Sequence, residues 1–125
     1  MSIWQQGGRK EMSVYILFDL DGTLTDPKEG ITRCVQYALS KFGIQTECEA
    51  LTRFIGPPAE SFERFYGLSR AESERAVAYY RERFTDTGIF ENRVIDGIPA
   101  LLDTISDAGA KRALATSKPQ VFAER

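Results

Sequence analysis

A run of five apolar residues, Val-Tyr-Ile-Leu-Phe, occupies positions 14–18. These residues favour β structure and show no polar alternation, which is typical of a strand buried on both faces of a parallel sheet. Residues 111–115 are predicted to form a second short strand, and the intervening segment 99–109 opens with proline and closes with glycine, as a helix does. Parallel strands joined through a helix end at the same edge of their sheet, so we expect Asp19 and Thr116 to face one crevice.

Helical spacing of apolar residues dominates the long segment between these strands. Asp26 and Pro27 give an N-cap followed by proline at the first helical position. Ser69 and Glu72 match a capping box, which predicts the start of another helix. The predicted helical pieces cover about residues 27–42, 50–54, 60–66 and 70–85.

The change from a strand-like to a helical pattern of apolar residues predicts that the chain is divided into separate structural units. Residues 26–90 are expected to form an all-α insert, because they contain four helical pieces and no convincing strand. Residues 12–25 and 91–125 are expected to form part of an α/β core around a parallel sheet. Residues 1–11 have no apolar period and are expected to be a loose extension.

The composition narrows the possible chemistry. The 125 residues carry a formal charge of −2 from 16 basic and 18 acidic residues, and both signs are spread along the chain, which predicts binding neither to nucleic acid nor to an anionic membrane. No apolar run approaches the roughly 20 residues that span a bilayer. The absence of histidine excludes a Ser-His-Asp triad and an imidazole zinc site. Cys34 and Cys48 are expected to be reduced thiols in a cytoplasmic protein.

Two carboxylates follow the first predicted strand directly. In extended chain, residues two apart project to the same side, so Asp19 and Asp21 should converge on one point. Such a pair suits an oxygen-seeking Mg²⁺ ion or a carboxylic acid with a raised pKa. Gly22 allows the backbone to turn sharply and leaves room for a bulky anion. The alternative is an ordinary turn, because aspartate and glycine are common turn residues.

Residues 14–26, which read Val-Tyr-Ile-Leu-Phe-Asp-Leu-Asp-Gly-Thr-Leu-Thr-Asp, closely resemble the first motif of the haloacid dehalogenase superfamily of phosphatases. Residues 113–119, Ala-Leu-Ala-Thr-Ser-Lys-Pro, resemble its second motif. The helical insert resembles the small helical cap of that superfamily. With Phe-Ile-Gly-Pro-Pro at 54–58, the chain is most similar to phosphoglycolate phosphatase-like enzymes and their 5′-nucleotidase relatives. The resemblance implies a Rossmann-like core that carries an inserted cap.

The resemblance also implies a role for each acidic residue. Asp19 would attack the phosphorus atom and form an aspartyl-phosphate intermediate. Asp21 would protonate the leaving alcohol and then take a proton from the attacking water. Mg²⁺ would be held by the Asp19 carboxylate and the Asp21 backbone carbonyl.

Other positions receive phosphate- or substrate-binding roles from the same resemblance. Thr116 would hydrogen-bond a phosphoryl oxygen, with Ser117 and the Gly22 region offering backbone N–H groups. The alternative for the Thr-Ser pair is a simple cap at the start of a helix. On the insert, Arg53 and Gly56 would face the leaving group when the cap closes. Lys118 is expected to be exposed at a helix start.

The chain departs from the family pattern at its carboxyl end. The third-motif lysine and the fourth-motif acidic pair do not occur before Arg125. Three accounts remain open: the chain is the leading part of an intact phosphatase, or a truncated and inactive product that serves as an interaction module, or a chain whose sheet is completed by another chain in an oligomer. For the parent, we expect hydrolysis of a small phosphorylated metabolite. Phosphoglycolate and nucleoside monophosphates are the leading substrates, and phosphomutase activity is a further alternative.

Overall fold

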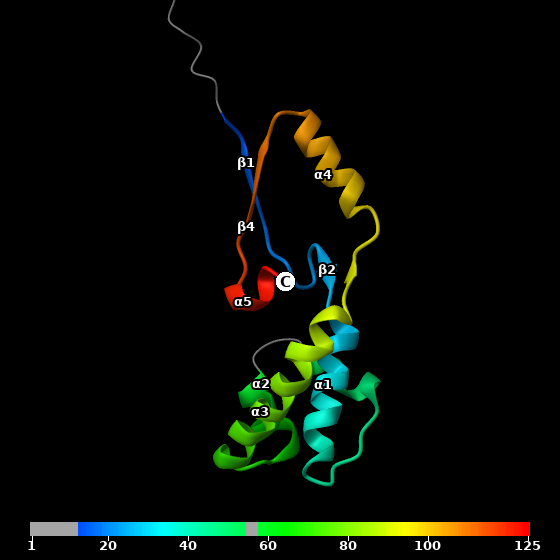
Figure 1. The fold of residues 1–125 in the computed structure, drawn as a ribbon, viewed down its shortest axis with the longest axis vertical. Helices are drawn as coiled ribbons and strands as arrows, with labels where there is room; N and C mark the ends of the chain where they lie inside the picture. Colours follow the sequence, from blue (N-terminus) through cyan, green and yellow to red (C-terminus); the bar gives the residue numbers. More distant parts are fainter. Residues whose placement is uncertain (1–12, 55–57) are drawn as a thin grey trace, which may run out of the picture.

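The computed structural model describes residues 13–54 and 58–125. Strands β1 (Tyr15–Phe18) and β4 (Lys111–Leu114) form a parallel pair, and a cluster of helices lies at the other end of the molecule. The short antiparallel strands β2 (Thr25–Asp26) and β3 (Arg93–Val94) connect the two parts (Figure 1). The expected loose extension, residues 1–11, lies outside the described residues.

The predicted parallel pair is confirmed. Tyr15 is paired with Lys111 at one end of the register and Phe18 with Leu114 at the other, so both strands end at the same edge. The predicted burial on both faces is wrong for this chain, because Tyr15 is 61% exposed and Leu17 68% exposed. In the described part of the chain this sheet has two strands, and helix α4 (Ile98–Asp107) contacts β4 without covering those side chains.

The predicted helical pieces between residues 26 and 90 are also confirmed. A three-residue 3₁₀ turn, η2, adds to them, and its carboxyl end leads into β3. We call the five elements together the helical insert. They are α1 (Lys28–Ser40), η1 (Cys48–Phe54), α2 (Pro58–Tyr66), α3 (Arg70–Asp86) and η2 (Gly88–Phe90).

One of the two predicted helix starts is confirmed, and the other is shifted by one residue. At α3 the Glu72 amide donates to Ser69 Oγ at 3.3 Å, and the Ser69 amide donates to Glu72 Oε2 at 2.8 Å, which completes the capping box. At α1 the predicted N-cap at Asp26 is wrong by one residue, because Pro27 is the N-cap and the helix begins at Lys28. The Asp26 side chain still accepts the Lys28 amide at 3.1 Å. Short-range sequence signals therefore fix where these helices begin to within one residue.

The main apolar core lies inside the helical insert. Phe54 and Phe62 are almost fully buried, with ring centres 5.2 Å apart, and Val35, Leu39 and Leu51 complete the centre. Burial of each such side chain contributes about 1.5–3 kcal/mol. Aromatic side chains of the insert pack against one another in and around this core. They are Phe42, Phe54, Phe62, Phe65, Tyr66, Tyr79, Tyr80 and Phe84.

Helix α1 and the η2 turn meet almost backbone to backbone. A Cβ atom added at Gly30 would collide with the carbonyl oxygen of Gly88, and one added at Gly88 would collide with the Cys34 sulfur. The Gly30 amide also donates to the Glu91 carbonyl at 3.0 Å. This contact needs glycine for space, and it fixes the base of the insert against the segment that returns to the core.

The sequence does not predict the connection between the insert and the core, because strands of two residues are too short to show an alternation of apolar and polar side chains. Here Arg93 donates to Asp26 Oδ2 from both Nε and Nη2, at 3.2 and 3.1 Å. The Ile95 amide continues the pairing by donating to the Leu24 carbonyl at 3.0 Å. Among residues 13–54 and 58–125, no helix is long and apolar enough to span a membrane.

Candidate active site

A tight turn follows β1 and carries the first candidate residues. The Leu20 carbonyl accepts the amides of Thr23, Leu24 and Thr25 at 3.2, 2.9 and 3.1 Å. Gly22 has a φ of 81°, and its amide donates to the Thr25 carbonyl at 2.7 Å. Glycine is favoured here because a side chain at this φ would be strained. Its own N–H is engaged within the turn, so a phosphate would have to meet other groups of this loop.

The two acidic residues have different surroundings. Asp19 is exposed, and its Oδ1 accepts the Leu20 amide at 2.7 Å. Asp21 is partly buried, with 28% of its side chain exposed, and its Oδ1 lies 3.2 Å from Lys118 Nζ. The first carboxylate is therefore open to a ligand, whereas the second is already paired with a cation from the other loop.

The loop that follows β4 lies beside the β1 loop. The Ala115 amide donates to the Phe18 carbonyl at 2.7 Å, which extends the parallel pairing to the point where both strands end. Directly after it, Thr116 Oγ1 accepts the Lys118 amide at 3.1 Å. The hydroxyl hydrogen of Thr116 is then free to be donated to a phosphoryl oxygen. Ser117 is exposed in the same loop.

Lys118 lies at the site, and the expectation that it is exposed is wrong. Only 8% of its side chain is exposed. The hydrogen bond to Thr116 holds its backbone close to the strand end, and its ammonium group reaches Asp21 on one side. On the other side the group lies 5.6 Å from the ring centre of Phe84, in α3. Asp21 and Phe84 are distant from Lys118 in the sequence, which explains why a local pattern could not reveal these contacts.

Three aromatic side chains pack together where the helical insert contacts this edge of the core. The Phe84 ring stacks on Tyr80 at 5.5 Å and meets Phe122 edge-on at 5.4 Å. Phe122 belongs to α5 (Gln120–Ala123), the short helix after the second loop. Burial raises the pKa of Tyr80, and the nearby charges of Cys34 and Asp21 raise it further. The Tyr80 hydroxyl is therefore neutral at physiological pH.

No contact among the described residues places the predicted substrate-binding residues of the insert at this edge of the sheet. Arg53 is exposed, and its guanidinium group lies 4.4 Å from the ring centre of Phe65 within the insert. Its role toward a substrate stays a prediction. Gly56 lies outside the described residues.

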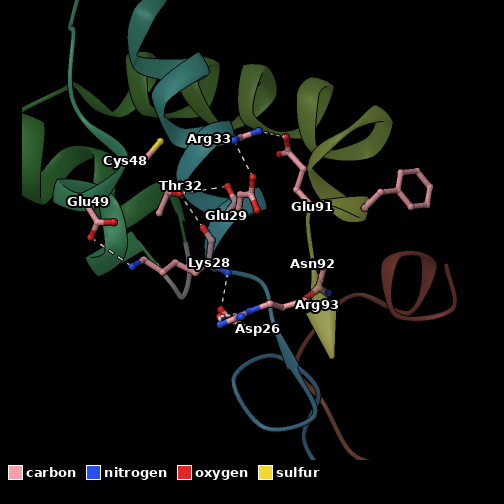
Figure 2. Close-up of a pocket in the computed structure, with 11 residues that line it drawn as sticks. Asp26, Lys28, Glu29, Thr32, Arg33, Cys48, Glu49, Glu91, Asn92 and Arg93 are labelled. Carbon is pink, nitrogen blue, oxygen red and sulfur yellow. Dashed lines mark hydrogen bonds and ion pairs between the residues drawn. The ribbon is translucent and has the colours of Figure 1, made fainter. Parts of the chain in front are cut away.

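The cleft drawn in Figure 2 is not the candidate site. Its volume is about 440 Å³, and it lies between α1, η1 and the connection to the core. Its charged side chains already pair with one another: Lys28 with Glu49 at 3.4 Å, and Arg93 with Asp26. None of the predicted catalytic or phosphate-binding residues lines it.

Glu91 ties three segments together at the edge of that cleft. Arg83 of α3 donates to both of its carboxylate oxygens, at 2.7 and 2.9 Å, and Arg33 of α1 donates to Oε1 at 3.0 Å. The hydrogen bonds from Arg83, followed by those from Arg33, hold the pKa of Glu91 below its ordinary value of 4.5. Arg83 also donates to the sulfur of the buried Cys34 at 3.3 Å, and burial raises the pKa of that thiol. Neither cysteine is in a disulfide, as expected.

Two oxygen atoms of the β1 loop are chemically suited to bind a Mg²⁺ ion. Asp19 Oδ2 and the Asp21 carbonyl oxygen accept no hydrogen bond within residues 13–54 and 58–125, whereas the neighbouring Leu20 carbonyl accepts several. Carboxylate and carbonyl oxygens are the ligands that magnesium prefers, and the ion commonly keeps several waters. The described residues contain no cluster of three or more His, Cys, Asp or Glu side chains that could hold a metal. This loop therefore offers two ligands of a larger set.

Comparison with known proteins supports the same family. A 5′-nucleotidase of Pseudomonas aeruginosa is 56% identical over 110 residues, which cover 86% of this chain and 50% of that protein. The tyrosine-protein kinase PtkA of Mycobacterium tuberculosis is 38% identical over 111 residues, with 88% and 38% covered. Phosphoglycolate phosphatase 1 of Pseudomonas aeruginosa is 30% identical over 116 residues, with 86% and 42% covered. The chain thus spans about half the length, or less, of the curated relatives it matches.

Structural comparison agrees with the sequence comparison. The crystal structure of a predicted phosphatase from Clostridium acetobutylicum matches with a TM-score of 0.78 and 48% identity, covering 90% of this chain and 53% of that one. The expected fold class, a partial Rossmann-like α/β core with an inserted all-α unit, is confirmed. The family model described as haloacid dehalogenase-like hydrolase matches residues 16–125. The chain belongs to the haloacid dehalogenase-like hydrolases.

Proposed function

We propose that the complete protein built on this chain is a Mg²⁺-dependent phosphatase that hydrolyses a small phosphate monoester through an aspartyl-phosphate on Asp19. The observation that carries the proposal is the parallel pairing of β1 and β4. Because both strands end at one edge, the loop with Asp19 and Asp21 and the loop with Thr116 emerge side by side. Ligands of open α/β sheets bind at that edge.

The chemistry divides into two displacements at phosphorus. In the first, a carboxylate oxygen of Asp19 forms a bond to phosphorus while the bond to the leaving oxygen breaks, and the carboxylic acid of Asp21 gives its proton to that oxygen. In the second, the Asp21 carboxylate takes a proton from water as the water oxygen attacks phosphorus. Inorganic phosphate leaves, and the Asp19 carboxylate is restored.

Other groups of the site bind the phosphoryl group. The Asp19 carboxylate and the Asp21 carbonyl would hold Mg²⁺, which when bound offsets the repulsion between the phosphate and the carboxylates. The Thr116 hydroxyl donates to a phosphoryl oxygen, and the backbone N–H of Ser117 lies in the same exposed loop.

A nucleoside monophosphate is the first substrate to test, because the relative with 56% identity is named a 5′-nucleotidase. Phosphoglycolate is the second, because a relative with 30% identity is named a phosphoglycolate phosphatase. Such metabolites and two free thiols fit a cytoplasmic enzyme. Arg53 and Gly56 of the insert are the proposed contacts to the leaving group.

The test is release of inorganic phosphate from a panel of esters by the complete protein and by its Asp19→Asn variant. The panel holds nucleoside monophosphates, phosphoglycolate and a hexose phosphate. We expect Mg²⁺-dependent hydrolysis that the substitution abolishes without changing the far-ultraviolet circular dichroism. Appreciable turnover by the Asp19→Asn variant would refute the assignment of the nucleophile. The 125-residue chain alone is expected to be inactive or weakly active.

A further inference from the structure

Lys118 joins three parts of the molecule at the candidate site. Its amide donates to Thr116 Oγ1 at 3.1 Å, and its ammonium group lies 3.2 Å from Asp21 Oδ1. The same ammonium group lies 5.6 Å from the ring centre of Phe84 in the helical insert. The Lys118 side chain therefore links the loop after β4, to which it belongs, with the loop after β1 and with helix α3.

The burial of this ion pair distinguishes it from the surface pairs of the chain. Arg70 and Glu74 pair with 88% and 70% of their side chains exposed, an arrangement that adapts freely and contributes little. The Lys118 side chain is 8% exposed, so its ammonium group has lost most of its water. The Asp21 carboxylate and the Phe84 ring face replace that water, which restricts where the charge can lie.

The contact with Lys118 restrains one carboxylate oxygen of Asp21 and leaves the other available. Oδ1 is held by Lys118, whereas Oδ2 has no hydrogen-bond partner among the described residues. A general acid must bring its proton within about 2.6–3.2 Å of the receiving oxygen. A carboxyl group that is fixed through Oδ1 cannot rotate freely, so Oδ2 is the atom suited to exchange a proton with the leaving group.

The helical insert completes this support. Phe84 is 7% exposed and is held between Tyr80 of the insert and Phe122 of α5. Its ring therefore has little freedom to move away from Lys118 while the insert stays in this position. No hydrogen bond joins α3 to Asp21 within the described residues, so Lys118 links the two by contact, although Asp21 also lies near enough to Tyr80 of α3 to raise the pKa of that hydroxyl.

We propose that Lys118 is a positioning residue that orients Asp21 for proton transfer, and that Phe84 holds Lys118 in place. The inference rests on the proposed function, because it assumes that Asp21 is the general acid. It goes beyond that function by assigning a role to a residue of the second loop and to one of the insert.

The test compares esters that differ in their need for a general acid. An alkyl phosphate releases a poor leaving group that must be protonated, whereas p-nitrophenyl phosphate releases a stable anion. We expect Lys118→Met in the complete protein to lower kcat/KM for the alkyl ester by about tenfold or more and to leave kcat/KM for p-nitrophenyl phosphate within about twofold. The ratio kcat/KM is the proper readout because it reports the first displacement and not the later hydrolysis.

Further variants separate positioning from other roles. Lys118→Arg should recover most of the alkyl-ester activity, because it keeps the charge beside Asp21. Phe84→Leu should lower the same activity by a smaller factor, and adding it to Lys118→Met should cause little further loss, because both act on one carboxylate. Lys41→Met is the matched control, since Lys41 is exposed and also lies over an aromatic ring, at 4.5 Å from the Tyr37 centre.

Several outcomes would overturn the inference. Equal loss for both esters would make Lys118 a phosphate-binding cation, and a lowered melting temperature with no rescue by arginine would make it structural. Independent, additive effects of Lys118→Met and Phe84→Leu would remove Phe84 from the proposal. If the wild-type protein hydrolyses neither ester, the proposed function fails first. If the wild-type protein hydrolyses both esters, and Lys118→Met leaves kcat/KM for the alkyl ester relative to that for p-nitrophenyl phosphate unchanged, only the present inference fails.

Discussion

The Ala115 amide lies 2.7 Å from the Phe18 carbonyl oxygen, so the parallel pairing of β1 and β4 continues to the last residue before each candidate loop. Any movement of one strand along the other would separate Asp19 from Thr116. The site is therefore positioned by main-chain hydrogen bonds of the sheet, whereas the helical insert acts on it through side chains.

Removal of the metal should stop turnover without unfolding the protein. The β1 loop offers an exposed carboxylate and a carbonyl oxygen without a hydrogen-bond partner among the described residues, which suit Mg²⁺. We expect that a chelator abolishes phosphate release by the complete protein and that added Mg²⁺ restores it. Circular dichroism recorded in parallel should not change. Full activity after exhaustive chelation would show that no metal is needed.

The Gly30→Ala substitution should destabilise the helical insert. The added methyl group would collide with the Gly88 carbonyl oxygen, and the Glu91 carbonyl oxygen would be 3.0 Å away. Overpacking of this kind costs about 1–3 kcal/mol, which outweighs the gain of up to about 1 kcal/mol from replacing a helical glycine. Urea unfolding measures the difference.

Ser40→Ala is the matched control for that experiment, because Ser40 ends the same helix and is exposed. Its effect should stay within about 0.5 kcal/mol. If Gly30→Ala unfolds at the same urea concentration as the wild type, the close approach of α1 and η2 is not present in solution.

The network around Glu91 should make stability depend on pH. Arg83 and Arg33 hold the pKa of this carboxyl below 4.5, so its contribution is fully present above that value and is lost as the pH falls through the lower, folded-state pKa. We expect Glu91→Gln to lower the free energy of unfolding at neutral pH and to lower it by less at an acidic pH below 4.5, where the carboxylate begins to be protonated. Glu74→Gln, at an exposed pair, should show little effect at either pH. A Glu91→Gln deficit that is the same at both pH values would contradict this assignment.

The Ser69→Ala substitution should weaken the start of α3. It removes the hydroxyl oxygen that accepts the Glu72 amide, and loss of such a cap costs about 1 kcal/mol. Ser69→Asp keeps an acceptor at the same place and should preserve most of the stability. Thermal unfolding followed by circular dichroism measures both variants. Equal loss in the two would mean that the capping bond contributes nothing.

Much of the fold could be predicted because local rules set it. Apolar spacing located the helices of the insert, and the capping box at Ser69 and Glu72 marked the start of α3 within one residue. The run at 14–18 and the Thr-Ser pair after the second strand were enough to predict that Asp19 and Thr116 leave the sheet at one edge. These features depend on neighbours in sequence or on the geometry of parallel strands.

The remaining features depend on partners that are distant in sequence. Lys118 is buried because Asp21 and Phe84 enclose its ammonium group, and no signal near position 118 reports either contact. The exposure of Leu17 has the opposite cause: its apolar pattern is that of a buried strand, yet no described element covers its face. A strand side chain is buried only where another layer of the structure packs against its face. The apolar pattern of the strand does not specify that layer.

The most direct test of the account is to trap the phosphorylated aspartate. The complete protein would be mixed with its best substrate, quenched in acid and treated with borohydride, which reduces an acyl phosphate to an alcohol and so converts the modified aspartate to homoserine. Mass spectrometry of the peptide that contains residues 14–26 reads the result. The account predicts homoserine at position 19 only when substrate is present. Rapid turnover with an unmodified Asp19, or homoserine at another aspartate, would contradict it.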